Sequence, residues 1–351
     1  MARSTPAGDV AASIAPARAA KDRARAWLLD QVAPDGTPAM ADRGNSWSRL
    51  PWAFALCGET AAGHAVLGWA TRHGVTAEGG LAQPAYGSGR FGAYPLGHLA
   101  MGSLLLERHD VARRVMDRLA ALQTPTGGFP IDPPGGEFAD LCDLLSTAQA
   151  GAAAVLAGRR DVAAPVWRWI AALHALQPTP TYRLFSARRG EALVTEPPQG
   201  IAWVVDTDFS KPRQTYFTSG IAAVFLAAYG SATGEPAALE MGHRFLRLNI
   251  TGTDEQFSDL ASVQACKFGW GLAAMHLADP RPEYVPWLQR MVTWFVDRQA
   301  ADGSWAPSTF LAPEPSLTEK MVKTAEHVME LDRVLAALVG SPDCALQCQL
   351  S

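Results

Sequence analysis

Four aspartates are the residues whose type and spacing best suit proton transfer. Asp140 and Asp143 are three residues apart near the start of an apolar segment over residues 138–157, and in a helix both would lie on one face. Asp206 and Asp208 are two residues apart in a β-prone run, and in a strand they would also share a face. Neighbouring carboxyl groups push each other's pKa values apart, so that one can act as an acid and the other as a base. Helix capping is the alternative role for Asp140 and for the second pair.

Other polar side chains could assist proton transfer. Tyr94 and His98 are one helical turn apart, although a single histidine in an apolar helix is often a core residue. The groups that we expect to polarise a substrate or relay a proton are Tyr94, His98, Tyr216 and His327. Lys211 and Arg213 precede an expected helix whose amino-terminal partial charge is positive, so they could bind an acidic group of a substrate.

These side chains are carried by helices of two alternating kinds. One kind is amphipathic and covers residues 19–32, 60–72, 110–123, 161–177, 235–249 and 283–299. The other kind is apolar nearly all round, which requires burial, and covers residues 47–57, 95–107, 138–157, 216–230, 259–277 and 319–338. Six buried helices alternating with six amphipathic ones predict an all-α (α/α)6 toroid, in which an inner ring is wrapped by an outer ring. An open helical solenoid is the alternative.

The loops locate the functional end of this toroid. Links from outer to inner helices are long and rich in Gly, Pro and aromatic residues, whereas links from inner to outer helices are short. Long loops in compact domains are usually functional, so we expect the active face at the amino-terminal ends of the inner helices. The longest link runs from Pro178 to Gln214, and its β-prone runs flanking Arg188-Arg189-Gly190 predict a small hairpin or lid, with a mobile loop as the alternative.

The last buried segment, residues 319–338, is unusually polar. Lysines and His327 fall on one side of it, and Glu326 and Glu330 fall on another. Because buried charges must be paired, either the core holds a charged pocket here or this helix is partly exposed where it closes the ring.

Two turns carry a recognisable motif. Residues Gln299 to Trp305 read Q-A-A-D-G-S-W and resemble the repeat of squalene–hopene-type triterpene cyclases. Residues Gln123 to Phe129 resemble the same repeat in the form found in protein prenyltransferase β-subunits. In both, glutamine would cap an outer helix, glycine would form the turn and the aromatic ring would pack on the next repeat. The resemblance implies the terpenoid cyclase and protein prenyltransferase toroid superfamily, a barrel that many carbohydrate-active enzymes also use.

The chemical motifs of that superfamily are incomplete here. Its type II cyclases carry a D-x-D-D proton-donor motif, whereas Asp206-Thr207-Asp208-Phe209 lacks the third aspartate. Asp140-Leu141-Cys142 resembles two zinc ligands of the prenyltransferases, and His327 could supply the third. Three residues are a short match, so zinc on Asp140, Cys142 and His327 is only the alternative to our expectation of no metal and no organic cofactor.

Composition limits the class of protein further. The chain has 351 residues, a net charge of −4, no basic tract and no long apolar run, so we expect neither a nucleic-acid partner nor a membrane span. Five scattered cysteines and the lack of an apolar leader favour the reducing cytoplasm. We expect a flexible amino-terminal segment over residues 1–18, one barrel domain over 19–340 and a tail over 341–351; the oligomeric state stays open.

Aromatic residues on the inner helices and loops would form a large apolar cavity. The side chains that we expect to bind substrate are Trp47, Tyr86, Arg90, Trp203, Lys211, Arg213, Cys266, Trp270 and Trp305. The sequence therefore predicts an enzyme of secondary metabolism, a cyclase, isomerase or lyase that uses acid–base chemistry on a mostly apolar, isoprenoid- or polyketide-like small molecule. A carbohydrate-active hydrolase, lyase or epimerase with paired carboxylates is the first alternative, and a toroid that binds a protein or peptide is the second.

Overall fold

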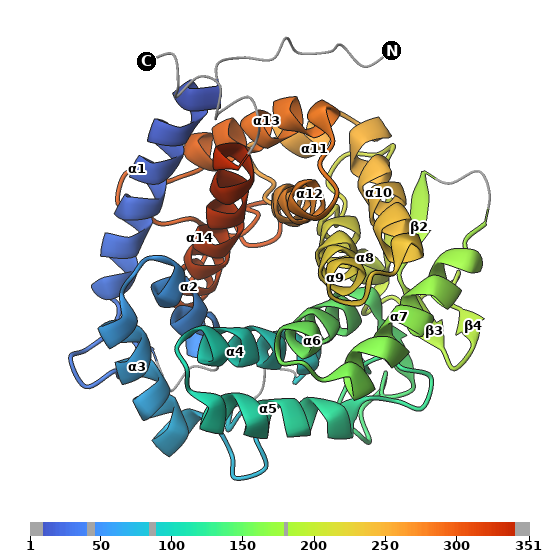
Figure 1. Ribbon diagram of the computed structural model, residues 1–351, viewed down its shortest axis with the longest axis horizontal. Coiled ribbons are helices and arrows are strands. Elements are labelled where there is room, and N and C mark those ends of the chain that lie inside the picture. Colours follow the sequence, from blue (N-terminus) through green and yellow to red (C-terminus); the bar gives the residue numbers. More distant parts are fainter. Residues whose placement is uncertain (1–9, 41–45, 84–88, 179–181, 341–351) are drawn as a thin grey trace.

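The computed structural model describes residues 10–40, 46–83, 89–178 and 182–340, and it shows a double ring of helices (Figure 1). The inner helices are α2 (Leu50–Leu56), α4 (Ala93–Leu105), α6 (Leu144–Leu156), α9 (Phe217–Thr233), α12 (Cys266–Ala278) and α14 (Leu317–Val339). The outer helices are α1 (Val10–Leu29), α3 (Thr60–Trp69), α5 (His109–Leu122), α7 (Arg160–Ala175), α10 (Pro236–Thr251) and α13 (Val285–Asp297). Short helical turns complete the set: η2 (Ser46–Arg49), η3 (Ala70–Gly74), α8 (Ala202–Val205), α11 (Glu255–Ser258) and η5 (Pro282–Tyr284).

The inner ring is closed. Each inner helix contacts the next one along the chain, and α14 returns to contact α2 and η2. The first outer helix, α1, contacts both α13 and α14, so that the two ends of the chain meet. The predicted (α/α)6 toroid is therefore confirmed, and the open solenoid is excluded.

The repeated turns work as the motif predicts. The side-chain amide of Gln299 donates to the carbonyl oxygen of Gly303 at 2.9 Å, and that of Gln123 donates to Gly127 at 3.0 Å. Both glycines have a positive φ, near +90°, which side chains rarely tolerate. The backbone N–H of Trp305 then donates to Oγ1 of a threonine on the following inner helix, as does that of Phe129. These motifs are structural, because they join each outer helix to its neighbours.

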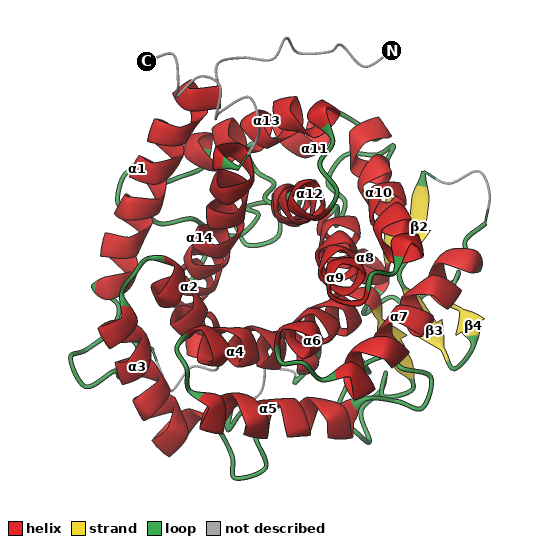
Figure 2. Cartoon of the chain, in the orientation of Figure 1, coloured by secondary structure: helices red, strands yellow, loops and turns green. Residues whose placement is uncertain are grey.

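The longest link forms two small antiparallel sheets at the outer edge of the ring (Figure 2). Strands β3 (Ala187–Arg189) and β4 (Ala192–Leu193) form the predicted hairpin, and β3 also pairs with β1 (Leu141–Asp143). Strand β2 (Arg183–Phe185) pairs with β5 (Asp206–Asp208). The hairpin lies beside α7 rather than over the middle of the ring in this view (Figure 1).

Three helices begin six or more residues away from the sequence expectation. Helix α12 begins at Cys266 rather than at residue 259, because residues 259–265 form turns. Helix α1 begins at Val10 rather than at residue 19, because its buried stripe extends back through Ala17 to Val10, so residues 10–18 of the segment expected to be flexible are helical. Helix α6 begins at Leu144 rather than at residue 138, because residues 141–143 pair with β3 instead. Residues 1–9 and 341–351 lie outside the described part. Among the described residues, no helix combines the length and the apolarity needed to cross a bilayer.

Candidate functional site

A cluster of buried charges lies where several inner helices begin. We call Arg49, Tyr94, Lys267, Lys323 and Glu326 the central cluster. One carboxylate oxygen of Glu326, Oε1, lies 3.3 Å from Nε of Arg49, 3.2 Å from Nζ of Lys267 and 2.5 Å from the hydroxyl of Tyr94, which donates to it. The other oxygen, Oε2, accepts from Nζ of Lys323 at 2.7 Å. The last inner helix is therefore polar because it carries buried, paired charges, and not because it is exposed where the ring closes.

Glu326 and Lys267 are both ionised in this cluster. Burial opposes the charge of Glu326, but Lys267, Lys323 and Arg49 outweigh it and hold the pKa of this carboxyl well below its usual value. Burial likewise opposes the charge of Lys267, yet Glu326 and its other neighbours raise the pKa of the lysine well above its usual value. Glu326 is thus a permanent anion that ties α14 to α12, α4 and η2, and it is poorly suited to give up a proton.

His98 lies beside this cluster as a neutral base. Its Nδ1 donates to the backbone carbonyl of Tyr94 at 2.9 Å, which leaves the lone pair on Nε2. Burial, and then the positive charge of Arg49, hold the pKa of His98 well below its usual value. Its Nε2 is buried and has no hydrogen-bond partner among the described residues. The centroid of the Trp52 ring lies 5.6 Å from that of the imidazole and 5.5 Å from that of Trp270, so His98 lies next to aromatic rings.

The four aspartates do not form pairs. Asp140 lies in the turn before β1, is exposed and is bound by Arg189 at 2.7 Å, so it does not share a helix face with Asp143 as we predicted. Asp206 and Asp208 lie on β5, as a strand-like run predicts, but each has its own cation.

Arg183 binds both oxygens of Asp206, at 2.6 and 2.5 Å, and Lys211 binds Asp208 at 3.1 Å. Although burial opposes it, hydrogen bonds from Ser210 and Lys211 lower the pKa of Asp208 overall, which is unsuitable for a proton donor.

Asp143 has a different environment. It is the cap residue of α6, where its Oδ1 accepts from the backbone N–H of Ser146 at 2.8 Å, and it is 1% exposed. None of the described cations forms an ion pair with it, and its Oδ2 has no hydrogen-bond partner among these residues. Burial raises the pKa of Asp143 to about 6, despite the opposing hydrogen bonds from Ser146. This carboxyl can therefore hold a proton close to neutral pH.

The predicted zinc ligands are not brought together. Asp140 binds Arg189, and the thiol of Cys142 contacts Thr124 at 3.7 Å. His327 instead lies with Cys266 and Glu330, whose ligand atoms are all within 4.8 Å of one another. Nδ1 of His327 donates to Glu330 at 2.8 Å, and burial raises the pKa of the Cys266 thiol to about 12. At this pKa the buried thiol is protonated near neutral pH when no metal ion binds it. The imidazole of His327 packs among Trp294, Phe295 and Trp305, and its buried Nε2 has no hydrogen-bond partner among the described residues.

Most of the predicted substrate-binding residues have structural contacts. Trp47 packs edge-on against Trp69 of α3, and the indole of Trp305 donates to the carbonyl of Phe295. Arg90, Lys211 and Arg213 bind the acidic residues Asp132, Asp208 and Asp259, in that order. The hydroxyl of Tyr216 donates to the carbonyl of Lys211, whereas Trp203 is exposed and Tyr86 lies outside the described residues. Trp270 contacts Trp52, which in turn contacts His98.

Sequence reasoning missed Arg49 and Lys267. Each is an isolated charge in an apolar segment, S-W-S-R-L-P-W and A-C-K-F-G-W, and such a charge must find a buried partner. That signal could have shown that Arg49 and Lys267 each need a buried partner, but not which residues provide it.

Comparisons with known proteins support the fold. No protein-family model matches the chain, and no curated protein matches it. Among solved structures, the type II terpene cyclase MstE from Scytonema, in complex with merosterolic acid A, is similar with a TM-score of 0.55 and 14% identity, over 93% of this chain and 99% of that one. The GH76A α-1,6-mannanase from Salegentibacter is similar with a TM-score of 0.63 and 11% identity, over 92% and 99% of the two chains. A protein from Actinoplanes is similar with a TM-score of 0.56 and 17% identity, over 91% and 99%. At these identities the similarity shows a shared (α/α)6 toroid fold.

Proposed function

We propose that this chain is an enzyme that isomerises, cyclises or eliminates a mostly apolar small molecule by proton transfer, at the ring end where the inner helices begin. One observation carries the proposal: of the four aspartates predicted to transfer protons, Asp143 alone is buried without a cation and has its pKa raised to about 6. Protonating an alkene or a carbonyl group needs such a neutral carboxylic acid.

A suitable base lies at the same end of the ring. Gly97 of α4 packs on Gln149 of α6, where an added Cβ would lie 2.8 Å from Cγ of Gln149. At about 1.5 Å per residue, Asp143 is therefore roughly 10 Å from His98 along the helix axes. Asp143 would add a proton to the substrate, and Nε2 of His98 would remove one elsewhere, so that the product is an isomer of the substrate. Trp52 and Trp270 would stabilise positive charge that develops between these two steps.

The substrate class can be tested with compounds on which the structural neighbours act. MstE is described in complex with geranylgeranyl dihydroxybenzoate as its substrate, and a GH76A mannanase variant in complex with α-1,6-mannotriose. We expect the purified chain to convert the prenylated acid, or a shorter prenylated analogue, into an isomer of the same mass. In D2O the product should gain one deuterium, because protonation starts the reaction. Mass spectrometry measures both outcomes.

Asp143→Asn is the decisive variant. Asparagine caps helices as well as aspartate does, so the fold should be kept while the proton donor is lost. We expect turnover to fall by a factor of about 100 or more. Asp140→Asn, which changes an exposed aspartate in the turn before β1, serves as the control and should keep full activity. Undiminished turnover in Asp143→Asn would refute the assignment.

Glycoside hydrolysis is the second candidate, because the mannanase gives the higher TM-score and because Glu326 and Glu330 place two buried carboxylates inside the ring. Hydrolysis of mannotriose to smaller sugars, with no conversion of the prenylated acid, would establish this reading instead.

A further inference from the structure

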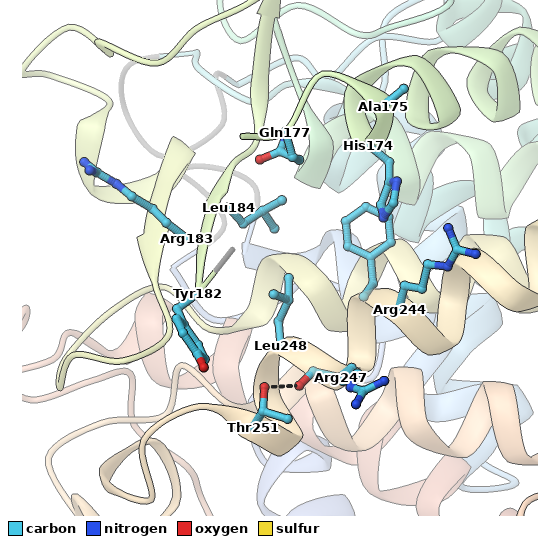
Figure 3. A pocket seen from close by; sticks show the side chains of 11 residues that line it. His174, Ala175, Gln177, Tyr182, Arg183, Leu184, Arg244, Arg247, Leu248 and Thr251 are labelled. Carbon is cyan, nitrogen blue, oxygen red and sulfur yellow. Dashed lines mark hydrogen bonds between the residues drawn. The ribbon is translucent and has the colours of Figure 1, made fainter. Parts of the chain in front are cut away.

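A pocket of about 590 Å³ lies on the outer side of the ring, between α7, α10 and β2 (Figure 3). His174 and Gln177 come from the end of α7, Tyr182 and Leu184 from the segment around β2, and Arg247 and Leu248 from the last turns of α10. The residues of the central cluster and Asp143 do not line it. This pocket is therefore separate from the site proposed above.

The pocket has more positive charge than its surroundings neutralise. Three arginines and a histidine line it, and no aspartate or glutamate does. Arg183 points away from the pocket and is neutralised by Asp206 (Figure 3). Arg244 contacts Glu240 at 3.4 Å, in a pair whose two side chains are more than half exposed. Arg247 forms no ion pair within the part of the chain that the structure describes. Arg244 and Arg247, one turn apart on α10, therefore leave a net positive charge at one side of the pocket.

The other surfaces of the pocket are apolar or already hydrogen-bonded. Leu184 and Leu248 lie in its middle (Figure 3), and the Phe245 ring is packed edge-on against His174 at 5.7 Å. The Gln177 amide bonds the backbone N–H and C=O of Phe185, at 3.0 and 2.9 Å, so that it is occupied by the edge of β2. The Thr251 hydroxyl is likewise occupied, because it donates to the Arg247 carbonyl. The guanidinium groups of Arg244 and Arg247, the Tyr182 hydroxyl and the His174 imidazole are the polar groups left for an occupant.

From these features we infer that the pocket binds a small amphipathic acid, with its apolar body on Leu184, Phe245 and Leu248 and its carboxylate on Arg244 and Arg247. Apolar burial provides contact area without selectivity, whereas the net positive charge of Arg244 and Arg247 selects the anion. The inference is independent of the reaction proposed for the ring interior, since it uses no residue of that site.

Binding of octanoate and of octanol tests the inference, because the two molecules share a chain and differ in the charged group. We expect isothermal titration calorimetry to show saturable binding of octanoate, at least about tenfold tighter than binding of octanol, because charge-assisted hydrogen bonds are the strong ones. Octanoate affinity should also fall as salt is added, while octanol affinity should not. Equal affinities for the two ligands, or no saturable binding of octanoate, would overturn the inference.

Paired variants locate the binding. Arg244→Gln combined with Arg247→Gln changes two exposed side chains and should weaken octanoate binding about tenfold without changing that of octanol. Arg113→Gln on α5 is the control, since Arg113 is also an exposed helical arginine and does not line the pocket. If the double variant binds octanoate as tightly as the unmodified chain does, the acid is bound elsewhere and the inference is wrong.

Discussion

The environment of each aspartate decides what its carboxyl group can do. Asp206 and Asp208 have the spacing of a catalytic pair, but Arg183 and Lys211 bind them separately. Asp143 has no such partner, and its burial makes the charged form costly. In the sequence, both pairs of aspartates have the close spacing that suggests acid–base chemistry. Only the contacts in the folded chain distinguish a structural carboxylate from a candidate proton donor.

The raised pKa of Asp143 predicts how stability depends on pH. Its pKa is about 6 in the folded chain against an ordinary value of 3.8, so the folded state binds the proton more tightly than the unfolded state does. Stability should therefore fall as the pH rises from about 4 to about 6, by about 3 kcal/mol for this group. Above that range Asp143→Asn should be more stable than the unmodified chain by up to this amount, and near pH 4 the two should be similar.

Urea unfolding at about pH 4 and about pH 7.5 measures this difference. Asp140→Asn is the matched control, because Asp140 is exposed and ion-paired, and it should show no comparable pH-dependent gain. If Asp143→Asn is destabilised by several kcal/mol at the higher pH, its carboxyl is ionised and well solvated in the folded chain, contrary to our assignment.

At the scale of elements, one turn is used repeatedly to join the outer helices. Four glycines with positive φ, Gly36, Gly79, Gly127 and Gly303, each lie where a Cβ would meet a backbone carbonyl oxygen of the following outer helix, at 2.0 to 2.6 Å. The partner of Gly303 is Arg23 of α1, so the last turn of the series packs on the first helix. These glycines are needed for close approach as well as for their φ values.

Gly127→Ala should lower the free energy of unfolding far more than an alanine substitution at a glycine that has a positive φ but open space around it. Its Cβ would lie 2.3 Å from the Pro165 carbonyl, at a φ of +94°, and we expect a loss of about 3 kcal/mol or more in the free energy of unfolding. Gly135 has a φ of +86° with nothing within 4 Å, so Gly135→Ala should cost about 1 kcal/mol. Equal losses in urea unfolding would show that the close approach of α5 and α7 carries little energy.

The same comparison explains which parts of the structure could be predicted from the sequence. The repeated turns and the two kinds of helix are local patterns, so the toroid could be predicted from Gln123, Gln299 and the apolar periodicity. Residues 141–143 look like the start of an apolar helix and become a strand only because β3 pairs with them. The partners Arg49 and Glu326 are 277 residues apart, so neither local spacing nor composition reveals their contact. Roles that depend on such distant contacts could not be predicted: Arg49 is missed by the sequence analysis, and Asp140 is bound by Arg189 instead of pairing with Asp143.

At the scale of the whole molecule, Glu326 is where the ring is closed electrostatically. Its carboxylate joins the last inner helix to η2 at the start of the chain, to α4 and to α12. The side chains of Arg49, Lys267 and Glu326 are nearly inaccessible, at 0%, 4% and 4% exposure, so water can replace little of what the ion pairs provide. Removing one partner of a buried ion pair leaves an uncompensated charge and is strongly destabilising.

Glu326→Gln should therefore lower the free energy of unfolding by about 3–5 kcal/mol, because it leaves Arg49, Lys267 and Lys323 without their shared anion. Asp117→Asn, which removes an exposed partner of Arg159, should cost less than about 1 kcal/mol. Nζ of Lys267 also lies 3.5 Å from Oε1 of Glu330. Combining Glu326→Gln with Lys267→Met removes one of the cations that Glu326 neutralises, so the double variant should be less destabilised than the sum of the two single variants. A double-mutant cycle from urea unfolding measures this coupling. Strict additivity would mean that Lys267 and Glu326 do not interact, and their ion pair would then contribute nothing to joining α12 to α14.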